Sequence, residues 1–552
     1  MSVLQRVNHL LLLLALFSLL LMLPGMAGLP VIDRDEAHFA QASRQMAQSG
    51  NYFQVRFQDK TRFQKPPGIN WLQAASVQLF GNADLSSIWP YRIPSLLGAF
   101  LSVLLTYWFG RYFINEQTAL IAAAILASSL LLIVETHMAV IDTSLLSSIL
   151  LMQGALWIIY QAGQSKKTVS LIWPACFWLA MSYGMVLKGV TPLVGVLSII
   201  SLCLIERRVD WLRQLRILPG LALFTALSLA WLLSLNAAEN SNYLMQMLHK
   251  DLLPKLQGGH ESHGKPPLFH LAILPLTFWP ASLFLWPAGE YAVKNRRTPI
   301  VKFLLSWLLP TWLFFELMPT KLPQYVLPTF PAIAILMALA IEDSRANGAI
   351  PGKWLRFLQG GWLLLSMGLL LALLLLPYLL TGHVTLTGIM LLVMVGIVSV
   401  VAVMYARGGA YYRAVMMVFL CATLSYPLIF ARLLPELKPV WITDTIAKRI
   451  DRSRLSDSRP LLVAGFEEPS LVFNLDTRLV RFTNIPEVQS ALIQDKTRLA
   501  LIEETVYQAW DPKQRERLTV YDRATGYNYS KGRWVRLLLI GQSQRNGGVD
   551  KT

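Results

Sequence analysis

The stretch WLLLSMGLLLALLLLPYLL, residues 362–380, is an apolar run without a single charged side chain. A helix needs about 20 such residues to cross the hydrocarbon core of a bilayer, so this run is long enough to span one. The rest of the chain has the same character. Of its 552 residues, 54% are apolar and 15% are charged, and the mean hydropathy is +0.47. This composition excludes a soluble globule and a disordered chain, and it indicates a polytopic membrane protein.

Similar apolar runs along the chain predict about thirteen spanning helices. They lie near residues 9–30, 89–110, 117–135, 142–160, 170–187, 190–205, 216–235, 268–288, 302–318, 324–341, 358–380, 385–405 and 412–434. A signal peptide is an alternative interpretation of the first run, but no clear small-residue cleavage motif follows it. The three cysteines, Cys176, Cys203 and Cys421, all lie inside apolar runs, which excludes a disulfide framework.

The placement of Lys and Arg predicts the orientation of these spans. If the N-terminus is cytoplasmic and the spans alternate, basic residues concentrate in the cytoplasmic loops, as the positive-inside rule requires. Examples are Lys166, Arg207, Arg297, Lys353 and Arg407. The opposite side then carries two long loops, residues 31–88 and 236–267, and the C-terminus. We therefore predict a multi-pass inner-membrane protein whose C-terminal part is periplasmic.

The composition changes after Pro435. Residues 436–552 carry many charges of both signs, unlike the apolar region 1–435. Amphipathic spacing predicts a helix over Ile442–Ile450, and short apolar runs predict strands. These strands are expected at Pro460–Ala464, Leu471–Phe473, Leu499–Ile502 and Val535–Ile540. The chain therefore divides into a membrane domain, 1–435, and a small α/β domain outside the membrane, 436–552.

Two groups of carboxylates lie at the edges of predicted spans. Asp33, Asp35 and Glu36 follow the first span in VIDRDEAHFA, residues 31–40, and Asp142 precedes the fourth span in HMAVIDTSLL, residues 137–146. Such groups can cap helices or begin a solvated loop. They can also serve as a general base or a metal ligand beside the membrane, where carboxylates are costly to place. On the second interpretation one carboxylate deprotonates an acceptor hydroxyl and the other orients it.

Three lysines are expected on the same side of the membrane as these carboxylates. Lys65 lies in RFQKPPGINW, residues 62–71, where two prolines stiffen the backbone. Lys188 interrupts two apolar runs, and Lys321 is followed one turn later by Tyr325. A lysine is a compact point charge that suits a phosphate. Snorkelling toward lipid headgroups is the alternative.

One further cluster lies in the second long loop. His260, Glu261 and His263 occur within four residues, and imidazole and carboxylate groups are ordinary ligands for zinc or a similar divalent metal. A loop that only forms hydrogen bonds is the alternative interpretation.

Taken in chain order, these motifs resemble the GT-C membrane glycosyltransferases, in particular the lipid A aminoarabinose transferases and the related protein O-mannosyltransferases. The resemblance covers most of residues 1–345. It depends on Asp35-Glu36, Lys65-Pro66-Pro67, Asp142, Lys188-Gly189, the loop before Phe278-Trp279-Pro280, and Lys321 with Tyr325.

The resemblance implies an α-helical GT-C fold and transfer of a sugar from a polyprenyl-phosphate donor to lipid A or lipopolysaccharide. It implies catalytic roles for Asp35, Glu36 and Asp142. It also implies donor-phosphate binding by Lys65, Lys188, Lys321 and Tyr325. The expected partners are the lipid donor, the glycan acceptor and membrane lipid, with no nucleic acid, and the protein is expected to be a monomer.

One position departs from the family pattern. The aminoarabinose transferases have a metal-binding Glu before Lys-Pro-Pro, and Gln64 stands there in this chain. Either the metal is absent, or His260, Glu261 and His263 supply more of its ligands. The sugar also stays open, with a uronic acid or a hexose transferred to core oligosaccharide or protein as the alternative. A lipid-linked sugar transporter or flippase is the alternative from another class, but the chain lacks the internal repeats typical of transporters.

The predicted orientation can be tested by thiol labelling. A cysteine introduced at Gly547 should react with a membrane-impermeant reagent in cells with a permeabilised outer envelope, and one at Arg296 should not, because the positive-inside rule places Arg296 in the cytoplasm. Labelling at Arg296 with protection at Gly547 would invert the topology.

Overall fold

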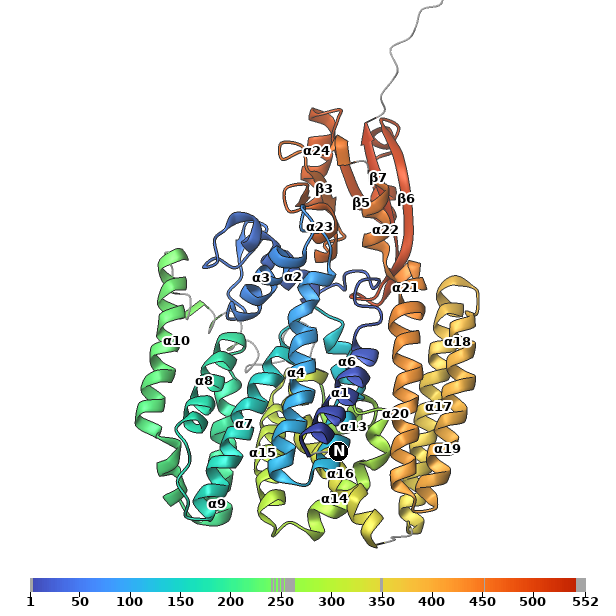
Figure 1. The fold of residues 1–552 in the computed structure, drawn as a ribbon. Helices are drawn as coiled ribbons and strands as arrows, with labels where there is room; N and C mark the ends of the chain where they lie inside the picture. Colours follow the sequence, from blue (N-terminus) through green and yellow to red (C-terminus); the bar gives the residue numbers. More distant parts are fainter. Residues whose placement is uncertain are drawn as a thin grey trace, which may run out of the picture.

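The computed structural model describes residues 3–239, 264–347, 351–450 and 452–542, with isolated positions between 240 and 263. Figure 1 shows a bundle of apolar helices with two smaller units on one end, which we call the capped end. One unit is built from the first long loop and the other from the C-terminal residues.

Eight helices in the described residues are long and apolar enough to cross a membrane. They are α4 (Trp89–Phe113), α7 (Asp142–Gln164), α10 (Ile217–Glu239), α15 (Pro299–Leu317), α16 (Phe330–Asn347), α17 (Lys353–Thr381), α18 and α19 (Leu386–Met390 and Gly396–Arg407, joined by a π turn), and α20 (Tyr411–Leu428). In α10 and α17 only 11% and 17% of the apolar window is buried. Their exposed leucines therefore face the lipid.

The remaining spans are bent or short. Helix α5 (Glu116–Ala127) meets α6 (Leu130–Thr136) at 60°, and α13 (Phe269–Thr277) meets the segment that ends in α14 (Leu285–Lys294) at 115°. Shorter apolar helices are α1 (Val3–Met22), α8 (Ile172–Leu187) and α9 (Thr191–Glu206). Each of the thirteen predicted spans corresponds to one of these helices or bent pairs, which confirms the predicted fold class.

The bend between α5 and α6 has a local cause. The hydroxyl groups of Ser128 and Ser129 donate to the carbonyl oxygens of Ile125 and Leu126, a local bonding pattern that competes with the helix ladder. The backbone N–H of Leu130 then donates to the Trp279 carbonyl oxygen at 2.9 Å. The break in α5–α6 is therefore fixed by a contact with the second bent span.

The C-terminal residues form a mixed five-stranded sheet in the order β4-β3-β5-β7-β6. The strands are β3 (Leu461–Ala464), β4 (Val480–Phe482), β5 (Leu499–Glu503), β6 (Leu518–Asn528) and β7 (Arg533–Gln542). Strand β3 runs parallel to β4 and β5, and β7 runs antiparallel to β5 and β6. The small sheet domain expected outside the helices is confirmed.

Both faces of this sheet are covered. Leu461 and Val463 point to one apolar cluster, and Leu462 and Ala464 point to another, as the two-residue period of a strand requires. Helices α22 (Ile442–Arg449) and α23 (Pro469–Leu475) cover the first face, and α24 (Ile485–Gln494) covers the second. Two short helices, α25 (Glu504–Gln508) and α26 (Pro512–Arg515), complete the domain.

One predicted strand is wrong. Leu471–Phe473 belongs to helix α23, because Pro469 occupies the first helical turn and favours helix initiation. All three residues are buried, so their apolar run gave no period by which to tell a strand from a helix.

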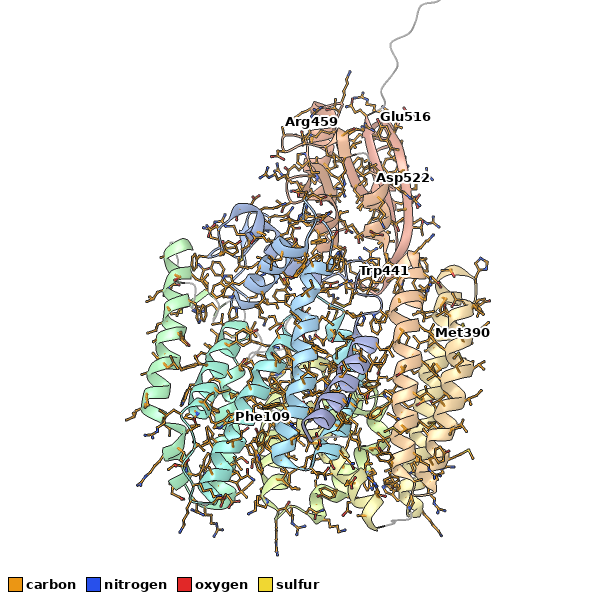
Figure 2. All side chains as sticks on the ribbon, viewed as in Figure 1. Phe109, Met390, Trp441, Arg459, Glu516 and Asp522 are labelled. Atoms are coloured by element: carbon orange, nitrogen blue, oxygen red, sulfur yellow. The ribbon has the colours of Figure 1, made fainter. Side chains whose placement is uncertain are left out.

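The first long loop forms the other unit at the capped end. Helix α2 (Asp35–Ser49) packs on α3 (Gly68–Phe80), and strands β1 (Arg56–Phe57) and β2 (Lys60–Thr61) pair between them. In Figure 1 this unit lies between the bundle and the C-terminal sheet. Figure 2 shows Trp441 where the C-terminal domain meets the bundle, and Arg459 and Glu516 at the remote end of that domain.

Candidate active site at the capped end

Three of the predicted site residues meet in one cluster. The Lys188 ammonium donates to the Asp142 carboxylate at 2.8 Å, and it lies 5.0 Å from the centre of the Tyr325 ring. The Lys188 and Asp142 side chains are only 12% and 11% exposed. Asp142 begins α7, Lys188 follows α8, and Tyr325 lies in the 3-10 turn Pro323–Thr329. The bundle therefore joins three elements at one charged point.

Lys188 owes its position to a break between two apolar helices. Its extended backbone ends α8, and the Thr191 hydroxyl holds the turn through the carbonyl oxygens of Gly184 and Lys188. A Cβ at Gly184 would lie 2.3 Å from the Thr191 side chain, so only glycine permits this close approach.

Glu135 is a fourth member of the cluster, and the sequence analysis missed it. It lies in the last turn of α6 and is 3% exposed. The charges that act on it are those of Asp142, Lys188 and Asp35. Its position within the apolar run LLLIVET was a usable signal, because a carboxylate inside a spanning segment marks a functional site by default.

Glu36 lies in a different environment from this cluster. Its carboxylate receives hydrogen bonds from Arg92 Nε at 2.8 Å and Nη2 at 2.9 Å, and from the backbone N–H groups of Ala139 and Ile32 at 2.8 Å each. Both side chains are fully buried. The Arg92 guanidinium also donates hydrogen bonds to the carbonyl oxygens of Met26, Leu29 and Pro30. The pair therefore ties the start of the first loop to α4 and to the segment before Asp142.

Asp35 is exposed, although it is the neighbour of Glu36. It stands in the first turn of α2, where a carboxylate is stabilised by the helix dipole. One turn further, burial and then the charge of Arg62 lower the pKa of His38 to about 4, so His38 is neutral near pH 7. The charge of Asp35 also acts on Glu135, so the loop carboxylate and the Asp142–Lys188 pair both lie within electrostatic range of this side chain.

The C-terminal domain holds the turn that precedes Asp35. Asp33 donates its backbone N–H to the Tyr529 hydroxyl at 2.6 Å and accepts from the Ser470 N–H at 2.9 Å. The Arg34 guanidinium donates to the Ser530 carbonyl oxygen. Arg34 has a φ of 70°, a strained conformation that the surrounding contacts must maintain. The domain therefore fixes the backbone from which Asp35 projects.

Lys65 lies in a segment that packs against the end of α8. It lines a small cavity with Phe39, Val55 and Asn70, and the Lys-Pro-Pro segment leads into α3. A Cβ on Gly68 would lie 2.6 Å from the Val186 carbonyl oxygen. The end of α8, two residues before Lys188, thus packs directly on this segment.

Lys321 is engaged elsewhere. It is buried, and its ammonium donates to the Lys265 carbonyl oxygen at 3.1 Å. The adjacent Thr320 pairs with Gly264. Lys321 therefore fastens the chain before α13, and its predicted role in phosphate binding stays a prediction.

The predicted metal ligands His260, Glu261 and His263 lie outside the described residues. Within the parts of the chain that the structure describes, no three His, Cys, Asp or Glu side chains are grouped to hold a metal ion. The zinc or similar divalent metal expected from the sequence stays a prediction.

The comparisons with known structures agree with this architecture. The crystal structure of ArnT from Cupriavidus metallidurans bound to undecaprenyl phosphate superposes with a TM-score of 0.74, covering 97% of this chain and 98% of that one at 17% identity. The chain has the ArnT fold. The archaeal oligosaccharyltransferase AglB from Archaeoglobus fulgidus is a more distant neighbour, with a TM-score of 0.53 at 11% identity over 100% of this chain and 76% of that one.

Sequence relatives point in the same direction. The family model for dolichyl-phosphate-mannose-protein mannosyltransferases matches residues 64–233, which include Lys65, Glu135, Asp142 and Lys188. An undecaprenyl phosphate-alpha-4-amino-4-deoxy-L-arabinose arabinosyl transferase of Pectobacterium carotovorum is 30% identical over 65% of this chain. A second such enzyme, from Pseudomonas fluorescens, is 31% identical over 66% of it. The chain spans 63% and 61% of the length of these two relatives. The resemblance predicted from the motifs is confirmed.

Glu36→Gln should damage the fold. The substitution leaves the Arg92 guanidinium buried without its counter-charge, and breaking a buried pair in this way costs roughly 3–5 kcal/mol. We expect a lower yield of folded protein and a lower melting temperature in detergent. Asp35→Asn, one residue away on an exposed side chain, is the matched control and should melt like the wild type. A Glu36→Gln protein as stable as this control would contradict the assignment.

The contact through Asp33 should respond to pH. Burial against the C-terminal domain raises the pKa of Asp33 from 3.8 to about 7. The folded state therefore keeps a proton that the unfolded chain gives up, and this stability is lost as the pH rises from about 4 through 7. Asp33→Asn cannot ionise, and it should melt a few degrees above the wild type near pH 9 but not near pH 4. Asp444→Asn, which removes a partly exposed carboxylate that pairs with Lys448 on α22, is the control. Equal pH dependence in all three proteins would refute the role of Asp33.

Proposed function

We propose that this protein transfers a sugar from a polyprenyl-phosphate carrier to lipid A at the outer face of the inner membrane. The observation that carries the proposal is the cluster of Asp142, Lys188 and Tyr325 below the Asp35 turn. It places an ammonium group and several carboxylates at the capped end of a lipid-embedded bundle.

The relatives support this substrate class. Those cited above are named as transferases of 4-amino-4-deoxy-L-arabinose from undecaprenyl phosphate, and the structural neighbour was crystallised with undecaprenyl phosphate. The same donor chemistry requires a cation near the membrane surface, a role that suits Lys188 and Lys65.

The leaving group in this reaction is the carrier phosphate. As the bond between the anomeric carbon and the phosphate oxygen breaks, negative charge grows on the phosphate, and a fixed ammonium group stabilises that charge. Lys188 fits this role because Asp142 and the Tyr325 ring hold it in place. Lys65, on its Pro-stiffened segment, is assigned to the same phosphate.

The attacking group is an oxygen of the acceptor. It forms the new bond to the anomeric carbon while the phosphate leaves with the bonding electron pair. If the oxygen belongs to a hydroxyl group, its proton passes to a base. Asp35 suits this role because it is exposed and its helix is anchored by the neighbouring Glu36–Arg92 pair. Asp142 orients the reaction centre through Lys188. Glu36, whose oxygens are already engaged, is assigned a structural role.

Aminoarabinose is the first candidate for the transferred sugar, and a uronic acid or hexose is the second. The second candidate is kept because Gln64 stands where the resemblance expects a metal-binding Glu. The C-terminal domain is proposed to be periplasmic, because it sits on the same end of the bundle as the site. The protein is proposed to act as a monomer.

A direct assay tests the proposal. Purified protein in detergent is incubated with radiolabelled undecaprenyl phosphate-aminoarabinose and lipid A, and the lipids are then extracted and separated. Labelled lipid A formed without any ion gradient supports a transferase. Donor binding without product under these conditions would favour a transporter or flippase, and a hexose-linked donor tests the second candidate.

Asp35→Asn should abolish transfer while leaving the protein folded. The amide has the size of the carboxylate but cannot take up the proton, and loss of a general base typically lowers the rate by about 10²–10⁴-fold. The initial rate at saturating donor measures the effect. A loss of only a few-fold would exclude Asp35 as the base and would fit an acceptor phosphate, which is already ionised.

A further inference from the structure

We propose that Glu135 contacts the transferred sugar and helps to determine which sugar is accepted. The inference rests on the proposed function and adds to it a residue that neither the motifs nor the comparisons assign. It starts from the environment of Glu135, which is 3% exposed and whose Oε2 atom has no hydrogen-bond partner among the described residues.

A buried carboxylate oxygen without a partner is costly. Leaving such a group unsatisfied costs about 1–3 kcal/mol, and more when it is charged. Glu36 shows what a structural carboxylate looks like in this protein, because Arg92, Ala139 and Ile32 supply it with four hydrogen bonds. The Oε2 atom of Glu135 receives no such hydrogen bonds. A bound ligand would supply the missing hydrogen bond.

The position of Glu135 matches that ligand. The charges that act on it are those of Asp142, Lys188 and Asp35, and helix α6, which carries it, packs on α7 and on the 3-10 turn of Tyr325. In the proposed reaction the sugar lies between the phosphate bound by Lys188 and the base at Asp35. A sugar in that position meets the unpartnered oxygen of Glu135.

The backbone that carries Glu135 is rigidly placed. Helix α6 starts after the 60° break of its span. The Tyr426 hydroxyl lies 2.7 and 2.8 Å from the carbonyl oxygens of Ser128 and Trp279, and it holds that break by sharing its one proton between these two acceptors. A binding group on a helix held in this way is preorganised, which is what discrimination between similar sugars needs.

Charge balance indicates the chemical class of the ligand group. The charges of two further carboxylates, Asp35 and Asp142, act on Glu135, and the ammonium group that also acts on it, Lys188, already donates to Asp142. The unpartnered Oε2 of Glu135 is a hydrogen-bond acceptor, so the ligand group that pairs with it is a donor, either a sugar hydroxyl or a sugar ammonium group. Leaving a buried polar group without its partner costs about 1–3 kcal/mol, so loss of this contact should weaken binding by roughly 10- to 100-fold.

The test compares three lipids on the full-length protein in detergent. They are undecaprenyl phosphate, undecaprenyl phosphate-aminoarabinose and undecaprenyl phosphate-arabinose, whose sugar is neutral. Their dissociation constants are measured for the wild type, Glu135→Gln and Glu135→Ala. The control is Glu116→Gln, at the opposite end of the same bent span, where the carboxylate is engaged by Tyr107.

We expect both Glu135 variants to bind undecaprenyl phosphate like the wild type and Glu135→Ala to lose roughly 10- to 100-fold in affinity for at least one sugar-linked lipid. If Glu135→Gln has a lower affinity only for the aminoarabinose lipid, the contact is to the ammonium group. The contact is to a hydroxyl group if Glu135→Gln has a lower affinity for both sugar lipids. It is also to a hydroxyl group if Glu135→Gln binds both sugar lipids like the wild type while Glu135→Ala binds them more weakly. All of these results support the proposal.

Unchanged affinity for both sugar lipids in Glu135→Ala would overturn it. So would an equal loss for sugar-free undecaprenyl phosphate, because Glu135 would then act on the phosphate through Lys188. A wild-type protein that binds none of the lipids would instead refute the proposed function. If neither variant folds, Glu135→Asp is measured instead, because it keeps the carboxyl group and moves it away from the sugar. Unchanged affinity of that variant for the sugar lipids would also overturn the proposal.

Discussion

The buried ion pair between Glu36 and Arg92 is the interaction on which the capped end depends. An arginine inside an apolar span is tolerated only when its donors are satisfied, and here the Glu36 carboxylate and three backbone carbonyl oxygens satisfy them. The same carboxylate accepts the Ala139 N–H, three residues before Asp142. One ion pair thus sets the position of α4, of the turn that carries Asp35, and of the start of α7. Replacing it would disturb both halves of the site together.

Asp35 and Glu36 show how neighbouring carboxylates acquire opposite roles. Successive residues on a helix point in directions about 100° apart, so when Glu36 turns into the bundle Asp35 is left on an exposed face. The C-terminal domain reinforces this arrangement, because Ser470, Tyr529 and Ser530 form hydrogen bonds with Asp33 and Arg34. The C-terminal domain therefore contributes to the candidate site, because it maintains the strained Arg34 backbone directly before Asp35.

The sequence predicted the spans well because hydropathy is a local property that the bilayer imposes on every spanning helix. It indicated Lys188 and Asp142 as candidate site residues because each is a charged group at the edge of an apolar run, and Tyr325 because it lies one turn after Lys321. It could not predict that Glu36 pairs with Arg92, since they are 56 positions apart and partner choice depends on helix packing. Leu471–Phe473 was misassigned for a related reason, because complete burial removes the alternation by which a strand is recognised.

The site lies where spanning helices are interrupted, and this follows from the physics of the membrane. A continuous helix satisfies its backbone polar groups internally and offers a ligand only side chains. The chain is interrupted between α5 and α6 and again between α8 and α9, and charged groups that follow such interruptions can face other polar groups rather than lipid. Glu135 follows the first break and Lys188 forms the second. If the proposed donor is correct, a phosphate with one lipid tail approaches these groups from the bilayer while its sugar remains among polar side chains, and the broken helices supply the place where the two meet.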